Sequence, residues 1–214
     1  MIESLPFLPK IIEIIRSKEF LVIFGLSVAI LSITTINSSL AQQSNGYFAL
    51  TTLGQDMQAD DYFLQDDHLV RHGDKQSWHI AVHNGMDNAE FVSIRVKLLN
   101  STQLIPNDSL NQPSPEPPIL ELRQMLAENS TSTISLDWSI KQADTELGYV
   151  TIKEITINGQ DISNLNIRSL DGQNFKVVLE LWRYDHDSNS FAYAWSSGHD
   201  MRSVWNQIWF NVET

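Results

Sequence analysis

Residues 20–36 read FLVIFGLSVAILSITTI, seventeen residues without a charge. As a helix this run would rise about 25 Å, which, with help from its flanks, reaches across a hydrocarbon core of about 30 Å. Three basic residues precede the run, namely Lys10, Arg16 and Lys18. The next charge after it is Asp56. The positive-inside rule therefore predicts one membrane span with a cytoplasmic N-terminus, and it predicts that everything downstream is exported.

The same run can also be interpreted as the apolar part of a signal peptide. Ser39 and Ala41, followed by two glutamines, provide the small residues that signal peptidase prefers at positions −3 and −1. Cleavage after Ala41 would secrete the rest of the chain. The region before the run is long, however, and its isoleucines at 11, 12, 14 and 15 could prolong one helix back to about Pro9. We favour an uncleaved anchor and keep cleavage as the alternative.

The charge balance restricts what the exported part can bind. The chain has 26 acidic against 14 basic residues, a net charge of −12, and the charges of the first 41 residues cancel. Residues 42–214 would therefore be repelled by nucleic acid and by anionic lipid. The chain has no cysteine, so disulfides, thiolate metal sites and cysteine nucleophiles are excluded. An exported domain of this kind depends on its hydrophobic core.

Short apolar or alternating runs, separated by Gly, Asn, Asp and Pro, fill the rest of the chain and are typical of strands and turns. The expected strands are 47–53, 76–83, 90–99, 131–140, 149–157, 175–184, 191–195 and 203–212. Their number and spacing favour an antiparallel β-sandwich. The domain organisation that we predict is a cytoplasmic or interfacial segment 1–19, the apolar helix 20–36, a juxtamembrane linker 37–45 and the sandwich 46–214.

Two stretches depart from this strand pattern. Residues 103–118 contain five prolines, which an interior strand or a continuous helix cannot accommodate, and we expect a surface excursion there. Residues 119–128, ILELRQMLAE, have apolar side chains at a helical period. They predict a short helix that caps one end of the sandwich.

Several segments resemble the archaeal membrane-protein family known as domain of unknown function 1616. They are YFALTTLGQDMQADDYF at 47–63, IAVHNGMDNAEFVSIRV at 80–96, FKVVLELWRYD at 175–185 and the terminal WNQIWFNV. The resemblance covers most of residues 46–214 and implies an immunoglobulin-like sandwich beside a membrane, without implying an activity. The chain differs from the family in having one apolar helix instead of several, and in its long Pro-rich excursion.

Candidate modification and metal sites are few. The Asn-x-Ser/Thr sequons at Asn100, Asn107 and Asn129 fall in or beside predicted loops, where a glycan could be tolerated. A His-x-Met pair with a nearby carboxylate suits copper outside the cell, and His199 and Met201 form such a pair. His68 and His72 could join it only if the fold brings the two regions together. We therefore expect no firm metal site and no cofactor.

No catalytic motif is present: there is no G-x-S-x-G elbow, no H-E-x-x-H pair and no phosphate-binding glycine loop. Trp205 and Trp209 share one face of the last predicted strand, opposite its apolar face, and would either complete the core or offer a contact surface. We expect a non-catalytic, membrane-tethered interaction module with a protein partner in the membrane or envelope. A more specific version is an accessory subunit of a membrane complex such as an archaeal ammonia monooxygenase. The alternative is an extracytoplasmic metal (copper) or solute binder.

Overall fold

Fourteen strands and one short 3₁₀-helix form the regular structure of residues 46–63, 68–198 and 200–214, the part of the chain that this computed structural model describes. The predicted anchor or signal segment, 20–36, and the linker, 37–45, lie outside these residues. In the described part, no helix is long and apolar enough to cross a bilayer. The fold is mainly β with antiparallel sheets, as the strand pattern predicted.

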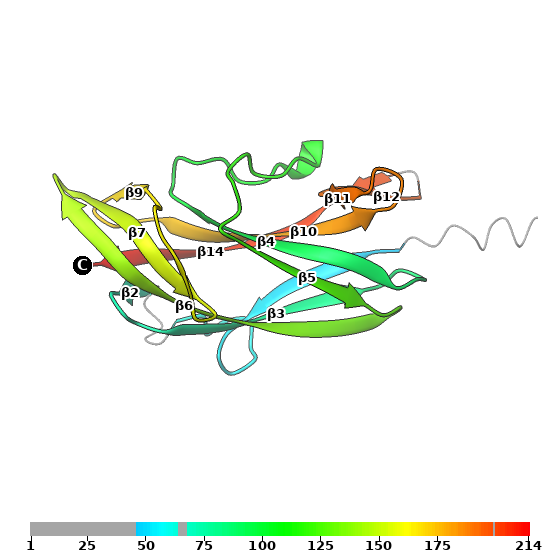
Figure 1. The fold of residues 1–214 in the computed structure, drawn as a ribbon, viewed down its shortest axis with the longest axis horizontal. Helices are drawn as coiled ribbons and strands as arrows, with labels where there is room; N and C mark the ends of the chain where they lie inside the picture. Colours follow the sequence, from blue (N-terminus) through cyan, green and yellow to red (C-terminus); the bar gives the residue numbers. More distant parts are fainter. Residues whose placement is uncertain (1–45, 64–67, 199) are drawn as a thin grey trace, which may run out of the picture. The chain divides into compact units, whose positions relative to one another are not determined.

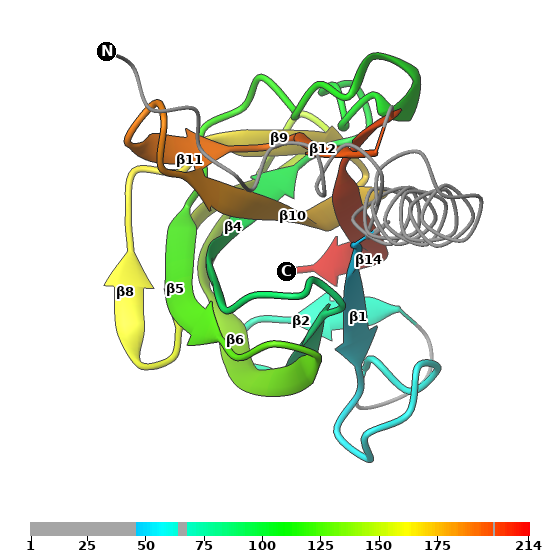
Figure 2. The same cartoon turned by 90° about the vertical axis from the view of Figure 1, so that its right-hand side faces the viewer.

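The strands form two six-stranded sheets that face each other (Figures 1 and 2). The first sheet has the order β1 (Phe48–Leu53), β3 (Gln76–Asn84), β6 (Ser130–Glu146), β7 (Tyr149–Ile157) and β8 (Gln160–Ile162), with β9 (Ile167–Leu170) on β7. The second has the order β2 (Leu69–Arg71), β14 (Val204–Glu213), β10 (Phe175–Asp185), β4 (Glu90–Leu99) and β5 (Leu120–Leu126), with β11 (Ser190–Ala192) on β10. A separate small hairpin joins β12 (Trp195–Ser197) to β13 (Asp200–Arg202).

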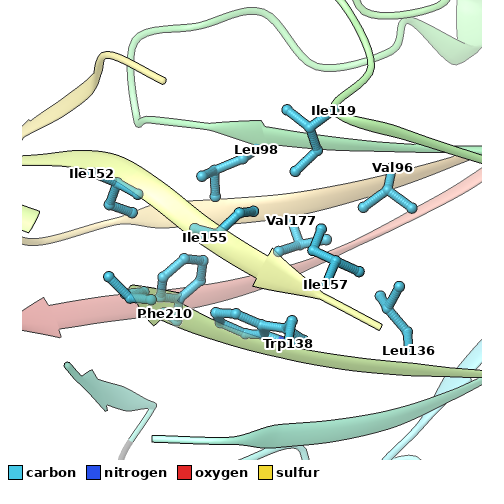
Figure 3. A pocket seen from close by; sticks show the side chains of 11 residues that line it. Val96, Leu98, Ile119, Leu136, Trp138, Ile152, Ile155, Ile157, Val177 and Phe210 are labelled. Carbon is cyan, nitrogen blue, oxygen red and sulfur yellow. The ribbon is translucent and has the colours of Figure 1, made fainter. Parts of the chain in front are cut away.

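Alternation along each strand builds the core between the two sheets. In β3, Trp78, Ile80 and Val82 are fully buried, while the residues between them are partly exposed. In β4, Val92, Ile94, Val96 and Leu98 alternate along the strand and are buried as well. A void of about 10 Å³ remains among the core side chains, and Figure 3 shows the apolar residues that line it. An apolar void of this size stays dry and offers no ligand site.

The predicted helix at 119–128 is wrong, because this segment forms β5. Residues from Leu120 to Leu126 pair antiparallel with β4, in register from Val96 to Glu90. The apolar side chains at 120, 122 and 126 fit a two-residue period as well as a helical one. Pairing with the open edge of β4 satisfies the backbone groups of both strands, and this tertiary gain overrides the local helical pattern.

The Pro-rich excursion connects β4 to β5 over the outer face of the second sheet (Figure 1). Its regular structure is limited to η1 (Asp108–Leu110), which Asn107 caps by accepting a hydrogen bond from the Leu110 amide. The prediction of a surface excursion is confirmed. The excursion also covers side chains on β4 and β10 that would otherwise be wet, so that Lys97 and Lys176 are only 2% and 3% exposed.

Candidate functional site

The described chain begins at one end of the two-sheet domain, which we call the proximal end. The carbonyl of Tyr47 accepts a hydrogen bond from the Gly85 amide, and Phe48 pairs with Asn84, the last residue of β3. β4 begins at this end, and β5 and β10 finish there. Any segment that precedes residue 46 therefore joins the domain at the proximal end.

An apolar row crosses the outer face of the second sheet at the proximal end. Met125, Phe91, Tyr184 and Phe191 come from β5, β4, β10 and β11. Ring centroids lie 5.9 Å apart for Phe91 and Tyr184, 5.3 Å for Phe91 and Phe191, and 5.4 Å for Tyr184 and Phe191. The guanidinium of Arg123 lies 5.2 Å from the Phe191 centroid. We call these five residues the proximal patch.

The proximal patch is not covered by the excursion and remains accessible. The rings of Phe91, Tyr184 and Phe191 are partly exposed, and Met125 is 65% exposed. Aromatic, methionine and arginine side chains are the residue types enriched in protein interfaces. A half-exposed apolar row on a sheet face therefore has the composition of a contact surface.

Acidic turns surround the proximal patch. Asp87 lies in the turn between β3 and β4, Glu128 in the turn between β5 and β6, and Asp185 and Asp187 at the turn between β10 and β11. Hydrogen bonds from the Ser188 hydroxyl and from nearby amides lower the pKa of Asp185 below its usual value. The rim of the patch is negative, in keeping with the net charge of the chain.

Next to the patch, a buried ion pair fastens the excursion to the sheet. The Lys97 ammonium lies 2.9 Å from the Glu180 carboxylate, and both side chains are almost completely buried. Glu180 also accepts hydrogen bonds from the Ser114 amide at 2.8 Å and from the Trp182 indole at 3.0 Å. Lys97 donates to the Ser114 carbonyl. Each charged group thus has several partners, and one of these partners is the excursion backbone.

Trp182 is partly exposed and contacts two neighbouring side chains. The Arg95 guanidinium lies 3.6 Å from its ring centroid, and the Tyr193 ring lies 5.7 Å away. Tyr193 itself is buried, and this burial raises the pKa of its hydroxyl well above the usual value. The Tyr193 hydroxyl should therefore remain neutral in the folded protein, where it has a structural role.

The raised pKa of Tyr193 predicts that the stability of the folded protein falls at alkaline pH. Above a pH of about 10 the unfolded chain releases the tyrosine proton while the folded chain keeps it, so stability falls as pH rises. The slope contributed by this group is at most about 1.4 kcal/mol per pH unit. Tyr193→Phe should remove this component, which urea unfolding at pH 8 to 11 would measure. An unchanged alkaline slope in the variant would contradict the assignment to Tyr193.

The two tryptophans that the sequence singled out have different environments. The Trp205 indole donates a hydrogen bond to Asp108 of η1, and Trp205 is partly exposed. Trp209 is 40% exposed, and the Lys176 ammonium lies 4.7 Å from its ring centroid. Burial lowers the pKa of Lys176. The two tryptophans share one face of β14, and Trp209 is the more exposed of the two.

Among the metal candidates, the structure describes His68, His72 and Met201. His68 lies beside Asn211, whose amide donates to the His68 carbonyl, near the end of β14. Met201 lies on β13, which pairs with β12 and precedes β14, whereas Asn211 lies near the other end of β14. His72 Nε2 lies 2.7 Å from the Lys141 carbonyl, and His199 lies outside the described residues. Within the described part, no group of three or more potential ligands is close enough to hold a metal ion.

The three sequons within the described residues, at Asn100, Asn107 and Asn129, differ in how far their side chains are engaged. The Asn100 amide donates to the Arg168 carbonyl, and its oxygen accepts three hydrogen bonds from Thr102 and Gln103. Asn107 caps η1 through its oxygen. Asn129 lies in the exposed turn between β5 and β6, with φ of 46°. Asn129 is therefore the sequon whose position best suits a glycan.

Comparisons with known proteins give no family. No model of a known protein family matches the chain, and no curated protein sequence matches it. Among solved structures, a β-glucosidase from Listeria innocua in complex with isofagomine is 11% identical with a TM-score of 0.39, over 78% of this chain and 16% of the β-glucosidase. The CARDB domain of a Pyrococcus furiosus protein, in complex with di-metal ions, is 8% identical with a TM-score of 0.37, over 80% of this chain and 97% of that domain. At these values neither likeness bears on function.

Proposed function

We propose that this chain is a membrane-tethered, extracytoplasmic binding module of immunoglobulin-like type, which acts by holding a protein partner rather than by catalysis. The observation that carries the proposal is the proximal patch, an aromatic row that neither the core nor the excursion uses. It lies at the end where the chain joins the domain from residues 20–36, the predicted membrane helix. This position suits a partner in the same membrane.

The charge of the rim specifies the partner further. Asp87, Glu128, Asp185 and Asp187 would be repelled by anionic lipid headgroups, so the patch suits a protein better than a lipid surface. We propose a partner whose contact surface is apolar at its centre and basic around it, the arrangement complementary to this one. The resemblance to domain of unknown function 1616 supports a place in an archaeal membrane complex. An accessory subunit of an ammonia monooxygenase is one specific version.

Co-purification from native membranes in mild detergent tests this proposal. The wild-type full chain should carry a stoichiometric companion, and Tyr184→Ala/Phe191→Ala should reduce the yield of that companion at least about tenfold, as for loss of interface hot spots. Leu170→Ala is the matched control, because Leu170 is 57% exposed on β9 but lies outside the patch. Raising the salt concentration should also weaken the complex, since the charged rim is screened. A wild-type chain that migrates alone, or a patch variant that keeps its companion, would contradict the proposal.

A further inference from the structure

The second sheet ends in a long edge strand, β5, that has no second partner strand in the described part of the chain. Its seven residues, Leu120–Leu126, pair with β4 in unbroken register. The backbone N–H and C=O groups on the other side of such a strand can bond to a further strand. Proline, lysine or a bulge usually prevents this, but β5 contains neither proline nor lysine. β5 is therefore a place where this sheet can be extended.

The other edge strands of the two sheets are shorter. β2, β8 and β11 have three residues each, and β9 has four. β1 has six residues, but its Thr52 exchanges hydrogen bonds with Asn206 of β14. Short edges offer few backbone groups to another chain. Among the edges that the structure describes, the one at β5 is thus the best suited to pairing between chains.

The apolar core is incompletely covered along β5. Leu120 and Leu122 lie directly opposite Val96 and Ile94 of β4, on the same face of the sheet. Val96 and Ile94 are 1% and 0% exposed, whereas Leu120 and Leu122 remain partly exposed. A strand added beside β5 would cover these two leucines. Burial of apolar surface therefore favours the extension together with the backbone hydrogen bonds.

The sequence of β5 is complementary to itself when two copies run antiparallel. A pairing centred on Leu122 places this residue opposite Leu122 of the second copy and places Glu121 opposite Arg123. By symmetry Arg123 then lies opposite Glu121, so two pairs of opposite charge form on the outer face. The Glu121 and Arg123 side chains are 26% and 55% exposed. In a chain with a net charge of −12, such a balanced segment lets two copies meet without repulsion.

We propose that two copies of this chain associate through β5, which pairs antiparallel with β5 of the second copy about a two-fold axis at Leu122. The second sheets of the two copies then form one continuous sheet. The axis is perpendicular to this sheet, so the two proximal patches lie on the same face of it. Both copies can be tethered to one membrane when the axis is normal to that membrane. The pairing needs no second protein, although Arg123 and Met125 belong both to β5 and to the proximal patch.

Introduced cysteines test the register in the full chain, which has no cysteine of its own. Leu122→Cys should cross-link two copies on mild oxidation, because residues opposite each other have Cα atoms about 4.5–5.5 Å apart, within the range of a disulfide. Leu120→Cys and Gln124→Cys are the matched controls on the same face of β5. Each should fail to cross-link, since its two copies would lie about 13 Å apart along the strands. The double variant Leu120→Cys/Gln124→Cys should cross-link, because these positions lie opposite each other.

Sedimentation equilibrium of the purified full chain in density-matched detergent measures the dimer without cross-links. Arg123→Glu would place carboxylates opposite each other at both charge pairs, and it should weaken the dimer at least about tenfold. Glu121→Arg/Arg123→Glu restores opposite charges across the axis and should recover most of the dimer. Arg168→Glu makes the same change of charge at an exposed position on β9 and should leave the dimer unchanged.

Far-UV circular dichroism and the urea midpoint confirm that each variant is folded. The inference would be overturned by a wild-type chain that stays monomeric up to a concentration on the order of 0.1 mM. Equal cross-linking at positions 122 and 124, or a dimer that Arg123→Glu leaves intact, would also overturn it. These experiments use the purified chain alone, so their failure would leave the co-purification test of the proximal patch unaffected.

Discussion

Exchanging Glu180 for glutamine is expected to lower the free energy of unfolding by about 3–5 kcal/mol, the usual cost of breaking a buried ion pair from one side. The Glu180 side chain is fully buried and accepts from Lys97, from the Ser114 amide and from the Trp182 indole. Glutamine keeps the shape but removes the negative charge, so the Lys97 ammonium remains buried without a counter-charge. The amide NH₂ must also face one of three donors. For a chain of this size the melting temperature should fall by roughly 6–20 °C.

Glu213→Gln is the matched control for Glu180→Gln. Glu213 pairs with Arg71 at 2.7 Å, but 58% of its side chain is exposed, so the expected cost is below about 1 kcal/mol. Urea unfolding can be followed by tryptophan fluorescence in the full chain, because all six tryptophans lie beyond residue 77. Equal losses for the two variants would show that the buried pair does not hold the excursion in place.

Replacing both members of the pair separates charge from shape. Lys97→Met/Glu180→Leu removes the two charges together, and buried pairs replaced by apolar side chains often lose little stability. We expect the double variant to unfold at a higher urea concentration than Glu180→Gln. The Ser114 amide, however, loses its acceptor in the double variant, whereas the glutamine Oε1 of Glu180→Gln can still accept from it. Limited proteolysis within residues 103–118 should therefore increase in the double variant.

Most strands of this fold could be predicted from the sequence, because each has one solvent-exposed face and one buried face. β4 at Glu90–Leu99 and β7 at Tyr149–Ile157 have the predicted bounds. Strands that follow no clear alternation were missed. β2 at Leu69–Arg71 has only three residues, and it forms by parallel pairing with β14, about 140 residues further along the chain. No local pattern encodes such a partner.

The covered side of the second sheet could not be predicted either. Alternation with the apolar residues of β4 would by itself place Lys97 on a solvent-exposed face, whereas the structure buries it under the excursion at 2% exposure. The signal in the sequence was the run of prolines at 103–118, which excluded regular structure there. A run of prolines does not specify where a loop packs, because that depends on long-range contacts such as the one between Ser114 and Glu180.

The proximal patch shows the same limit. Phe91, Met125, Tyr184 and Phe191 belong to four strands, and their adjacency follows from sheet order and register. The sequence pointed instead to Trp205 and Trp209, which are close together in the chain and easily noticed. Of these, Trp205 donates a hydrogen bond to the excursion, and the environment of Trp209 depends on Lys176 from β10. Candidate residues from strand faces are reliable only once the register is known.

Replacing Trp78 by alanine should cost about 3–5 kcal/mol of unfolding free energy, the range typical of a large buried aromatic residue. Trp78 is fully buried in β3, and its ring lies edge-on against Phe63 and Trp138, with centroids 5.9 and 5.1 Å away. Alanine would leave a cavity among side chains from both sheets. Urea unfolding with the remaining five tryptophans as the probe measures the loss.

Trp78→Phe distinguishes packing from hydrogen bonding at the same position. The Trp78 indole donates to the Tyr62 carbonyl at 2.6 Å, and phenylalanine removes this donor while keeping an aromatic ring. We expect a loss of about 1–2 kcal/mol, less than for alanine. If Trp78→Phe and Trp78→Ala lose the same stability, the hydrogen bond to Tyr62 outweighs packing in this part of the core, contrary to what the burial of Trp78 predicts.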